Sequence, residues 1–352
     1  MTRLSASAVE TPWMPHQDQR LLDLSAWLDQ QLPEVIARCG WGEVPAAQLT
    51  AASSDASFRR YFRWQGGERS LIVMDAPPPQ EDCRPFVKVA QMLDEAGVHV
   101  PQVLAADLER GFLLLSDLGR QTYLDVIDQG NANALFDDAI EALLKFQLQP
   151  VSQPMPAYDE ALLRREVQLF PEWYVQRHLG HTFTDAQQAA WERICQKLID
   201  SALAQPRVLV HRDYMPRNLM ISEPNPGVLD FQDAVLGPVS YDITSLFKDA
   251  FLSWPEVQVQ TWLEGYWHKA RAAGVALPDS LEEFLRASDL MGLQRHLKVI
   301  GIFARICHRD GKPRYLADVP RFFAYIEAVL ARRPELAELQ QLLAELPQAP
   351  HA

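Results

Sequence analysis

The chain has 352 residues, of which 48% are hydrophobic and 22% are charged, which is typical of a folded globular protein and argues against a disordered or fibrous one. Its length exceeds the ~250–300 residues at which a single core usually stops growing, so we expect two lobes. The net charge of -13 argues against nucleic acid and against an anionic membrane surface as partners, because both attract basic patches.

The cysteines and the apolar segments point to a cytoplasmic protein. The four cysteines are widely spaced and form no CxxC pair, which argues against a disulfide framework or a structural zinc site. No run of about 18 apolar residues is present, and the first 20 residues lack the apolar segment of a signal peptide. We therefore expect a cytoplasmic protein with no membrane partner, and we expect a monomer.

The first third of the sequence alternates helical and strand-like patterns. Residues 21–39 repeat apolar residues at helical spacing, which predicts an amphipathic helix. The pair Gly66-Gly67 separates two strand-like runs and is a hairpin signal. Strand, strand, helix, strand and strand patterns follow one another at 57–64, 70–76, 85–96, 100–104 and 111–119. This order predicts a small α+β lobe.

After Gly119 the sequence becomes mainly helical. Helical spacing of apolar residues recurs at 132–149, 158–178, 185–204, 255–272, 281–308 and 320–331. The predicted fold class is therefore α+β. We expect a β-rich lobe over 1–115 that binds nucleotide, a hinge over 116–119, and a larger helical lobe over 120–352 for catalysis and substrate binding.

The helical pattern is interrupted once, by a loop-and-hairpin segment at 207–230, within the stretch Val208–Leu246 that carries the chemistry. A short buried strand is followed by a polar loop, and two strand-like runs at 219–222 and 227–230 are joined by the turn-rich sequence EPNPG. These two runs predict a β-hairpin. In such a hairpin the start of the first strand lies beside the end of the second.

This hairpin should bring Asn218 and Asp230 together, with Asp213 on the loop that leads into the same end. Carboxylate and amide oxygens are hard ligands that suit Mg²⁺. Phosphoryl transfer needs metal ions to neutralise phosphate charge and a carboxylate to orient the attacking hydroxyl. We expect Asn218 and Asp230 to bind the metal. Asp213 is the expected catalytic base, with Asn218 assisting in catalysis.

The order His-Arg-Asp, four residues, Asn, a hairpin and Asp-Phe resembles the catalytic and metal-binding loops of protein-kinase-like enzymes. Asp-Phe-Gln in place of Asp-Phe-Gly, and an Asp-Ile soon after Gly237-Pro238, make the chain similar to the aminoglycoside phosphotransferase and choline kinase family. The resemblance implies a bilobal protein-kinase-like fold, with ATP and Mg²⁺ as cofactors. It also implies that Asp242 accepts backbone hydrogen bonds from the catalytic loop. A histidine in the position of His211 more often braces such a loop than acts in the chemistry, so we expect a structural role for His211.

Two neighbours of this segment have two interpretations each. Asp233 is either a second magnesium ligand or a solvated acid, and the second interpretation is slightly favoured. Arg217 either contacts phosphate or an anionic substrate, or balances the nearby carboxylates.

The nucleotide side departs from the protein-kinase pattern. The resemblance implies that the first hairpin covers ATP, and the turn before it includes Ser57. It also implies that adenine meets the backbone of Ser116, Asp117 and Leu118. The strand over 70–76 has no lysine to bind phosphate, so Arg59 or Arg60 is expected to replace it. Because adjacent strand residues face opposite sides, at least one of the two only covers the sheet surface; Arg60 is the candidate for the nucleotide.

Segments spread over residues 50–325 resemble one branch of this family, bacterial kinases of cell-wall amino sugars. The resemblance implies an amino sugar as the small-molecule partner. The implied reaction phosphorylates the C1 hydroxyl of N-acetylmuramate and N-acetylglucosamine to sugar 1-phosphates in peptidoglycan recycling, a route linked to fosfomycin tolerance.

Five residues of the helical lobe are candidates for sugar binding. Arg295 and Lys298 share one helix face and would meet the lactyl carboxylate, unless that face is solvated. Trp173 or Tyr174 would stack on the sugar ring, although aromatic residues at helical spacing more often belong to a core. Glu166 would accept a sugar hydroxyl.

Two other functions compete with this one. An aminoglycoside kinase would suit an acidic protein, but the basic segment 294–314 argues against it. A pseudokinase that only binds partners would explain the missing lysine, but Asp213, Asn218 and Asp230 are all present.

Overall fold

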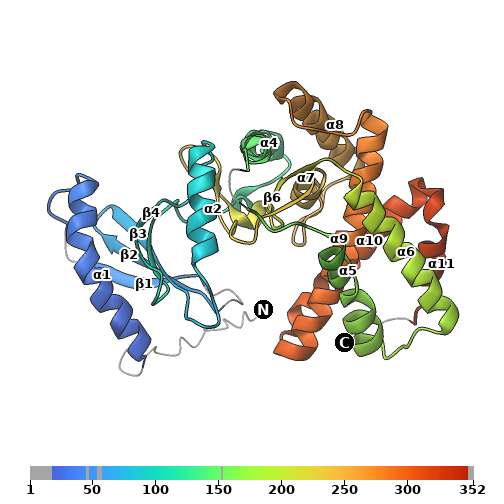
Figure 1. Cartoon of the computed structure of the whole chain (residues 1–352), viewed down its shortest axis with the longest axis horizontal. Coiled ribbons are helices and arrows are strands. Elements are labelled where there is room, and N and C mark those ends of the chain that lie inside the picture. The colour runs from blue at the N-terminus through green and yellow to red at the C-terminus, as the bar shows by residue number, and fades with distance from the viewer. Residues whose placement is uncertain (1–17, 45–46, 54–57, 152–153, 348–352) are drawn as a thin grey trace, which may run out of the picture. The chain divides into compact units, whose positions relative to one another are not determined.

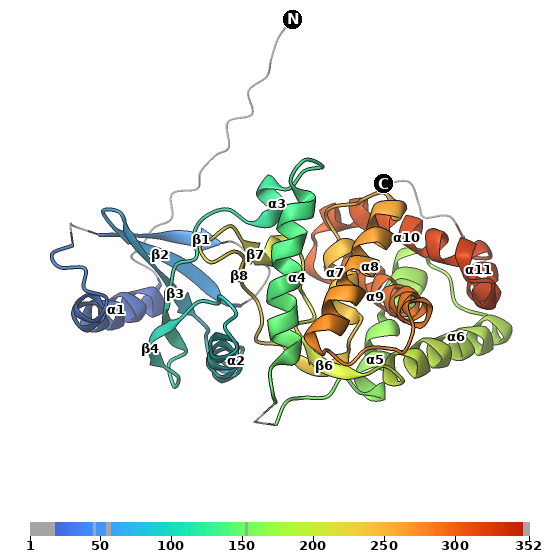
Figure 2. The ribbon, with the colours of Figure 1, turned by 90° about the horizontal axis from the view of Figure 1, so that it is seen from above.

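The structure is a computed structural model, and it describes residues 18–44, 47–53, 58–151 and 154–347. The chain divides into two compact units. The first comprises Met1–Arg84 and Gln102–Asp117, and the second comprises Pro85–Pro101 and Leu118–Ala352. Figures 1 and 2 show the elements in chain order.

The first unit contains a five-stranded antiparallel sheet in the order β1-β2-β3-β5-β4. The strands are β1 (Gln48–Ser53), β2 (Arg60–Gly66), β3 (Arg69–Asp75), β4 (Val103–Asp107) and β5 (Phe112–Ser116). The predicted hairpin is confirmed, with Gly66 opposite Arg69 and Arg60 opposite Asp75. Strand β1 was not predicted, because its small residues give little strand signal.

Helix α1 (Gln19–Arg38) packs on this sheet, as the amphipathic pattern predicts (Figure 1). The Asp18 side chain caps its first turn by accepting a hydrogen bond from the backbone N–H of Leu21. The buried side chains of the helix join those of the central strands in one apolar cluster, which includes Leu24, Trp27, Leu28, Trp64, Val73 and Phe112. Burial of this apolar face holds the helix to the sheet.

The second unit is mainly helical. Helix α2 spans Arg84–Glu95, and all of it except Arg84 belongs to this unit. The other helices are α3 (Tyr123–Val126), α4 (Ala132–Leu148), α5 (Glu160–Val167), the π-helix η2 (Phe170–His178), α6 (Asp185–Leu203), α7 (Tyr241–Phe247), α8 (Glu256–Ala273), α9 (Leu281–Asp310), α10 (Val319–Arg332) and α11 (Ala337–Ala344). Short 3₁₀ turns lie at Pro216–Asn218, Pro313–Asp318 and Pro334–Leu336. The six helical segments predicted here are present. Helices α3, α7 and α11 were not predicted, because each is at most eight residues long.

The segment predicted as one helix over 158–178 is divided into α5 and η2. Pro171 has no N–H to donate to the preceding turn, which interrupts the regular hydrogen-bond ladder. Gly301 of α9 lies against the same point, where an added Cβ would come within 2.3 Å of the Leu169 carbonyl carbon. The close approach of α9 therefore requires a glycine at this position.

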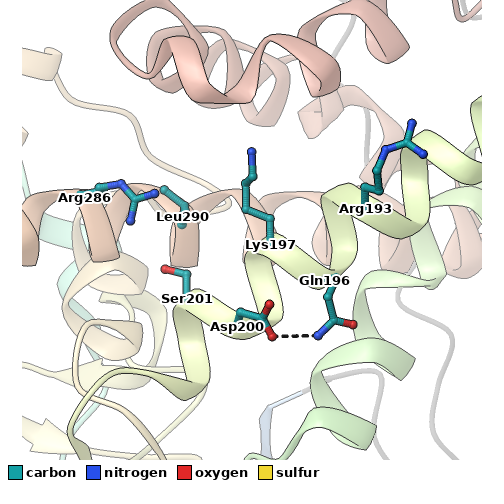
Figure 3. A pocket seen from close by; sticks show the side chains of 7 residues that line it. All are labelled: Arg193, Gln196, Lys197, Asp200, Ser201, Arg286 and Leu290. Atoms are coloured by element: carbon teal, nitrogen blue, oxygen red, sulfur yellow. Dashed lines mark hydrogen bonds between the residues drawn. The ribbon is translucent and has the colours of Figure 1, made fainter.

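A cavity of about 510 Å³ lies between α6 and α9 (Figure 3). All but one of its lining residues are charged or polar; they are Arg193, Gln196, Lys197, Asp200, Ser201, Arg286 and Leu290. None of these residues belongs to the segment 208–246, so this cavity is separate from the predicted catalytic residues.

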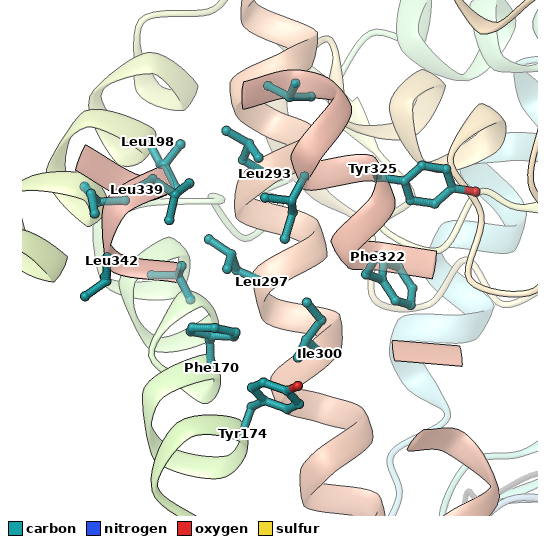
Figure 4. Packing of buried hydrophobic residues seen from close by; sticks show 14 of the residues in the cluster. Phe170, Tyr174, Leu198, Leu293, Leu297, Ile300, Phe322, Tyr325, Leu339 and Leu342 are labelled. Atoms are coloured by element: carbon teal, nitrogen blue, oxygen red, sulfur yellow. The ribbon is translucent and has the colours of Figure 1, made fainter. Parts of the chain in front are cut away.

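Helix α9 is the centre of the second unit and packs against α5, α6, α7, α8, α10 and η2. A capping box at Ser280 starts it, and Gly311 in the left-handed conformation ends it. Figure 4 shows Leu297 and Ile300 of α9 on the side of Phe170 and Tyr174 of η2. The labelled members of this core are Phe170, Tyr174, Leu198, Leu293, Leu297, Ile300, Phe322, Tyr325, Leu339 and Leu342.

Two short antiparallel pairs interrupt the helices. Strand β6 (Arg207–Val210) pairs with β9 (Val235–Pro238), and β7 (Leu219–Met220) pairs with β8 (Gly227–Val228). The second pair is the predicted hairpin and is confirmed. Strand β9 was not predicted. In the part of the chain that the structure describes, no helix is both long and apolar enough to cross a membrane.

Candidate active site

The loop from His211 to Asn218 connects β6 to β7, and its start is fixed by Asp242 of α7. The fully buried Asp242 carboxylate accepts hydrogen bonds from the backbone N–H of His211 at 2.7 Å and of Arg212 at 3.0 Å. Burial raises the pKa of Asp242 to about 6, although the neighbouring His211 and these two N–H groups act to lower it. The two hydrogen bonds therefore fix the start of the loop relative to α7.

His211 is fully buried and ties the loop to the end of the hairpin. Its Nε2 donates to the carbonyl oxygen of Leu229 at 2.9 Å, since a carbonyl can only accept. Its Nδ1 is then the acceptor for the backbone N–H of Asp213, at 3.3 Å. The imidazole thus links the loop residue Asp213 to the residue that precedes Asp230.

The hairpin brings Asn218 and Asp230 together. The backbone N–H of Leu229 donates to the carbonyl oxygen of Asn218 at 2.9 Å. The Asn218 Nδ2 donates to the Asp213 carbonyl at 2.8 Å and lies 3.5 Å from Asp230 Oδ2. Because the amide nitrogen is used inside the loop, the amide oxygen is the group that remains to meet a cation.

Gln232 holds the acidic residues of this site side by side. Its Nε2 donates to Asp230 Oδ1 at 2.8 Å and to Asp233 Oδ2 at 3.3 Å. Although Asp230 reaches solvent, desolvation raises its pKa, and the charges of Asp213 and Asp233 raise it further. We did not predict a role for Gln232. Its place as the third residue of Asp-Phe-Gln, directly after the predicted metal ligand, is the feature of the sequence that could have indicated one.

Two residues of the site have backbone conformations that side chains rarely adopt. Arg212 has φ 78° and Asp230 has φ 63°, and they are the only described non-glycine residues with positive φ. Such conformations cost about 1–3 kcal/mol each and persist only where the surrounding contacts enforce them. Strain at Asp230 itself and at Arg212, the residue before Asp213, is the pattern expected at a functional site.

The donor set fits a magnesium ion. Desolvation and, to a lesser extent, the charges of Asp213 and Asp233 raise the Asp230 pKa, and a divalent cation would offset the repulsion between these carboxylates. Among the described residues, no three or more His, Cys, Asp or Glu side chains are arranged to hold a metal by themselves. A cation here would need the Asn218 amide oxygen and phosphate oxygens as well, which is the way Mg²⁺ is usually held in kinases.

Glu166 lies among cations inside the second unit. Its Oε1 accepts from Arg212 Nη2 at 2.6 Å and pairs with Lys298 Nζ at 3.0 Å, and its Oε2 accepts from the Tyr158 hydroxyl. Burial acts to raise the pKa of Glu166, but Lys298 and Arg212 hold it below its usual value. The roles of Arg212 and Tyr158 were missed; only Arg212 has a signal, as the middle residue of His-Arg-Asp.

The helix face that carries Arg295 and Lys298 is not solvated, so that alternative is wrong. Both residues are buried, at 2% and 8% exposure. Lys298 Nζ donates to the Tyr241 hydroxyl at 3.2 Å. Arg295 Nη1 lies 3.4 Å from the carbonyl oxygen of Lys248, and its guanidinium lies 6.0 Å from the Tyr241 ring centre.

The remaining sugar candidates have contacts of their own. The Arg217 guanidinium lies 5.1 Å from the centre of the Phe251 ring. Trp173 is half-buried and packs against the apolar core around α9, and Tyr174 is buried within that core (Figure 4). Packing of Tyr174 supports the core interpretation for that residue.

In the first unit Arg60 is held by carboxylates. Its Nε and Nη2 donate to Asp75 Oδ2 at 2.9 and 2.6 Å, and it pairs with Asp18. Asp75 is fully buried and faces Arg60 across the β2–β3 pair, so it requires cationic partners. These contacts do not support phosphate binding by Arg60. The alternative residue, Arg59, pairs with Glu81 at 3.0 Å.

The residues predicted to meet adenine are also described in part. Asp117 accepts two hydrogen bonds from Arg63, at 2.6 and 3.0 Å. The Ser116 hydroxyl oxygen accepts from the backbone N–H of Gln102 at 2.8 Å. Leu118 is buried and belongs to the second unit. Ser57 lies outside the described residues. None of these contacts identifies a nucleotide site.

The sequence places the chain in a known enzyme class. The chain belongs to the phosphotransferase enzyme family, whose sequence model matches residues 48–284. The protein is a phosphotransferase that uses an alcohol group as acceptor. It is 70% identical over 333 residues to the N-acetylmuramate/N-acetylglucosamine kinase of Pseudomonas putida, covering 95% of this chain and 98% of that protein. It is 45% identical to the protein of that name from Neisseria meningitidis, covering 93% and 96%.

Solved structures of distant relatives have the same fold. The choline kinase LicA from Streptococcus pneumoniae matches with a TM-score of 0.58 at 13% identity, over 87% of this chain and 99% of that one. The gentamicin complex of APH(2")-IIa matches with a TM-score of 0.56 at 15% identity, over 88% and 97%. The predicted α+β, protein-kinase-like fold is confirmed.

Proposed function

We propose that the protein transfers the γ-phosphate of ATP to the C1 hydroxyl of N-acetylmuramate and N-acetylglucosamine. The products are sugar 1-phosphates, which re-enter cell-wall precursor synthesis during peptidoglycan recycling. We place the reaction in the cytoplasm, where ATP is supplied. The names of relatives that are 70% identical over nearly their whole length support the amino sugars as substrates.

The observation that carries the proposed chemistry is the arrangement at the end of the β7–β8 hairpin. Asn218 Nδ2 lies 3.5 Å from Asp230 Oδ2 and 2.8 Å from the backbone of Asp213. Asn218 and Asp230 hold Mg²⁺, which when bound neutralises phosphate charge. The Asp213 carboxylate orients the sugar hydroxyl and accepts its proton, a contribution worth ~10²–10⁴ in rate. An anomeric hydroxyl is more acidic than an ordinary alcohol, so one carboxylate suffices.

Arg295 is our candidate for the lactyl carboxylate of N-acetylmuramate. It is buried, yet its one described hydrogen bond is long, at 3.4 Å to a backbone oxygen. A guanidinium with donors to spare recognises a carboxylate through two parallel hydrogen bonds. Lys298 and Glu166 are paired with each other, so their contacts do not support direct binding of the sugar.

The test measures ADP release with ATP, Mg²⁺ and a set of acceptors. N-acetylmuramate and N-acetylglucosamine are expected to give turnover. The methyl glycoside of N-acetylglucosamine, in which the C1 hydroxyl is blocked, is the matched control and is expected to give none. Turnover of the methyl glycoside would exclude C1 as the acceptor, and turnover of kanamycin alone would replace the amino sugars by an aminoglycoside.

A further inference from the structure

Three charged side chains from three parts of the second unit meet in its interior. Glu166 comes from α5, Arg212 from the catalytic loop and Lys298 from α9. Glu166 Oε1 receives both cations, Arg212 at 2.6 Å and Lys298 at 3.0 Å. Only 7% of the Glu166 side chain and 10% of the Lys298 side chain are exposed. Buried charges of this kind are costly unless each has a partner.

We propose that Glu166, Arg212 and Lys298 act as one positioning unit, which fixes the catalytic loop so that the Asp213 carboxylate is held where the acceptor hydroxyl must be oriented. This inference rests on the proposed function of Asp213. It reassigns Glu166 and Lys298 from binding sugar to positioning the base.

The first argument is the way Arg212 is fixed. Its backbone N–H donates to Asp242 at 3.0 Å, while its side chain donates to Glu166 at 2.6 Å. It thus has one anchor on α7 and one on α5, and its φ of 78° is a conformation that needs such enforcement. Asp213 is the next residue, so a shift of Arg212 moves Asp213 directly.

The second argument is the position of Lys298. Its Nζ contacts Glu166 at 3.0 Å and the Tyr241 hydroxyl at 3.2 Å, which links α9 to α5 and α7. Tyr241 directly precedes Asp242, the residue that binds the loop backbone. Burial acts to lower the pKa of Lys298, but its neighbours, Tyr241 and Glu166 first, raise it above the usual value. Asp213 also contributes, so the ammonium lies within electrostatic reach of the proposed base.

The third argument is that Glu166 is already occupied. Both of its oxygens are used, Oε1 by two cations and Oε2 by the Tyr158 hydroxyl. A sugar hydroxyl would have to displace a charged or buried donor to reach it. A carboxylate that serves two cations inside the protein is better suited to holding them than to selecting a substrate.

The main test is Glu166→Gln, which removes the charge and keeps the shape. Glu172→Gln, an exposed glutamate of η2, is the matched control. We expect kcat to fall roughly 10²-fold for Glu166→Gln, because a misplacement of about 1 Å costs that much, with KM values for ATP and sugar within about threefold. A kcat within about threefold of wild type would overturn the proposal. A rise of KM for the sugar with unchanged kcat would also overturn it, because Glu166 would then contact the substrate.

Glu166→Gln leaves two cations without their carboxylate, so it could fail to fold. Lys298→Met provides the second test, because it leaves Glu166 paired with Arg212. We expect a roughly tenfold lower kcat at unchanged KM, and recovery of most of the activity in Lys298→Arg. If the two residues act as one unit, the double variant Glu166→Gln/Lys298→Met should lose about as much kcat as Glu166→Gln alone. Losses that multiply would show that the two residues act independently and would overturn the proposal.

Asp213→Asn in the same assays separates the two levels of inference. If Asp213→Asn is inactive while the Glu166 and Lys298 variants retain wild-type kcat, the positioning unit is wrong and the proposed function stands. If Asp213→Asn retains wild-type kcat, Asp213 is not the base and both proposals fail.

Discussion

Two buried carboxylates, Asp75 in the first unit and Glu166 in the second, are each held by two cations. Asp75 is contacted by Arg20 of α1 and Arg60 of β2, whose side chains are 31% and 35% exposed. The partners of Glu166 are more deeply buried, and one of them belongs to the catalytic loop. The ion pairs of Asp75 therefore connect a helix to a sheet in the first unit, and those of Glu166 connect a helix to a strained loop in the second. The two clusters contain similar ion pairs. They differ in the elements that carry the cationic side chains, and this difference distinguishes a structural cluster from a functional one.

The largest effect is expected for the loop that the Glu166 cluster supports. Asp213→Ala should lower kcat by about 10²–10⁴-fold, because it removes the base, while ATP binding measured by calorimetry stays within about threefold. Retention of more than about a tenth of wild-type turnover would exclude Asp213 as the base. The Glu166 cluster would then have no functional role to distinguish it from the Asp75 cluster.

The next effect concerns the cluster in the first unit. Asp75→Asn leaves Arg20 and Arg60 without their shared carboxylate and should destabilise the protein by about 3–5 kcal/mol. Urea unfolding followed by tryptophan fluorescence measures this loss. The kcat of the remaining folded protein should equal that of the wild type; a lower kcat with unchanged stability would make Asp75 a functional residue and break the comparison.

Another buried carboxylate, Asp249, sharpens the comparison because one of its oxygens, Oδ2, has no described hydrogen-bond partner. Burial raises its pKa to about 6, although Arg295 acts to lower it. The folded protein therefore binds this proton more tightly than the unfolded chain. The resulting stability is fully present below the unfolded-state pKa of 3.8 and is lost as the pH rises through about 6.

Comparison with Asp249→Asn isolates this contribution. Relative to the variant, the wild type should lose at most about 3 kcal/mol of unfolding free energy between pH 4 and pH 7, since one pKa unit corresponds to about 1.36 kcal/mol. Urea titrations of both proteins at four pH values measure the difference. A difference that does not change with pH would mean that Asp249 titrates normally in the folded protein.

The smallest effect is expected for an exposed ion pair on the same helix as Glu166. Glu160 pairs with Arg164 one turn away at 3.0 Å, and its side chain is 54% exposed. Glu160→Gln should change the unfolding free energy by no more than about 0.5 kcal/mol and leave kcat unchanged. An effect as large as that of Asp75→Asn would show that burial does not separate these pairs.

Local signals in the sequence were sufficient for much of the fold. The Gly66-Gly67 pair and the EPNPG turn each specify a hairpin, and their registers place Arg60 opposite Asp75 and Asn218 beside Asp230. The first of these registers comes from the structure, in which Gly66 pairs with Arg69 and the loop is Gly67-Glu68, and it argues against Arg60 as a phosphate ligand. Helical spacing of apolar residues likewise identified the long helices, because one face of each is buried.

Tertiary contacts carried the rest. Glu166 and Arg212 are 46 positions apart, and nothing in their local sequence links them. The division between α5 and η2 depends on the approach of Gly301 from another helix. Burial of Arg295 and Lys298 could not be inferred from their charge, because a basic helix face is usually solvated and only the structure supplies Glu166 and Tyr241 as partners.

The central claim is that Asp213, beside Asn218 and Asp230, directs a C1 hydroxyl at the terminal phosphate of ATP. Phosphorus NMR of the reaction with N-acetylmuramate tests it most directly, with wild type and Asp213→Asn run side by side. We predict a new phosphomonoester signal coupled to the anomeric proton in the wild type, and no such signal in Asp213→Asn over the same time. A product phosphorylated at another hydroxyl, or equal product from Asp213→Asn, would contradict it.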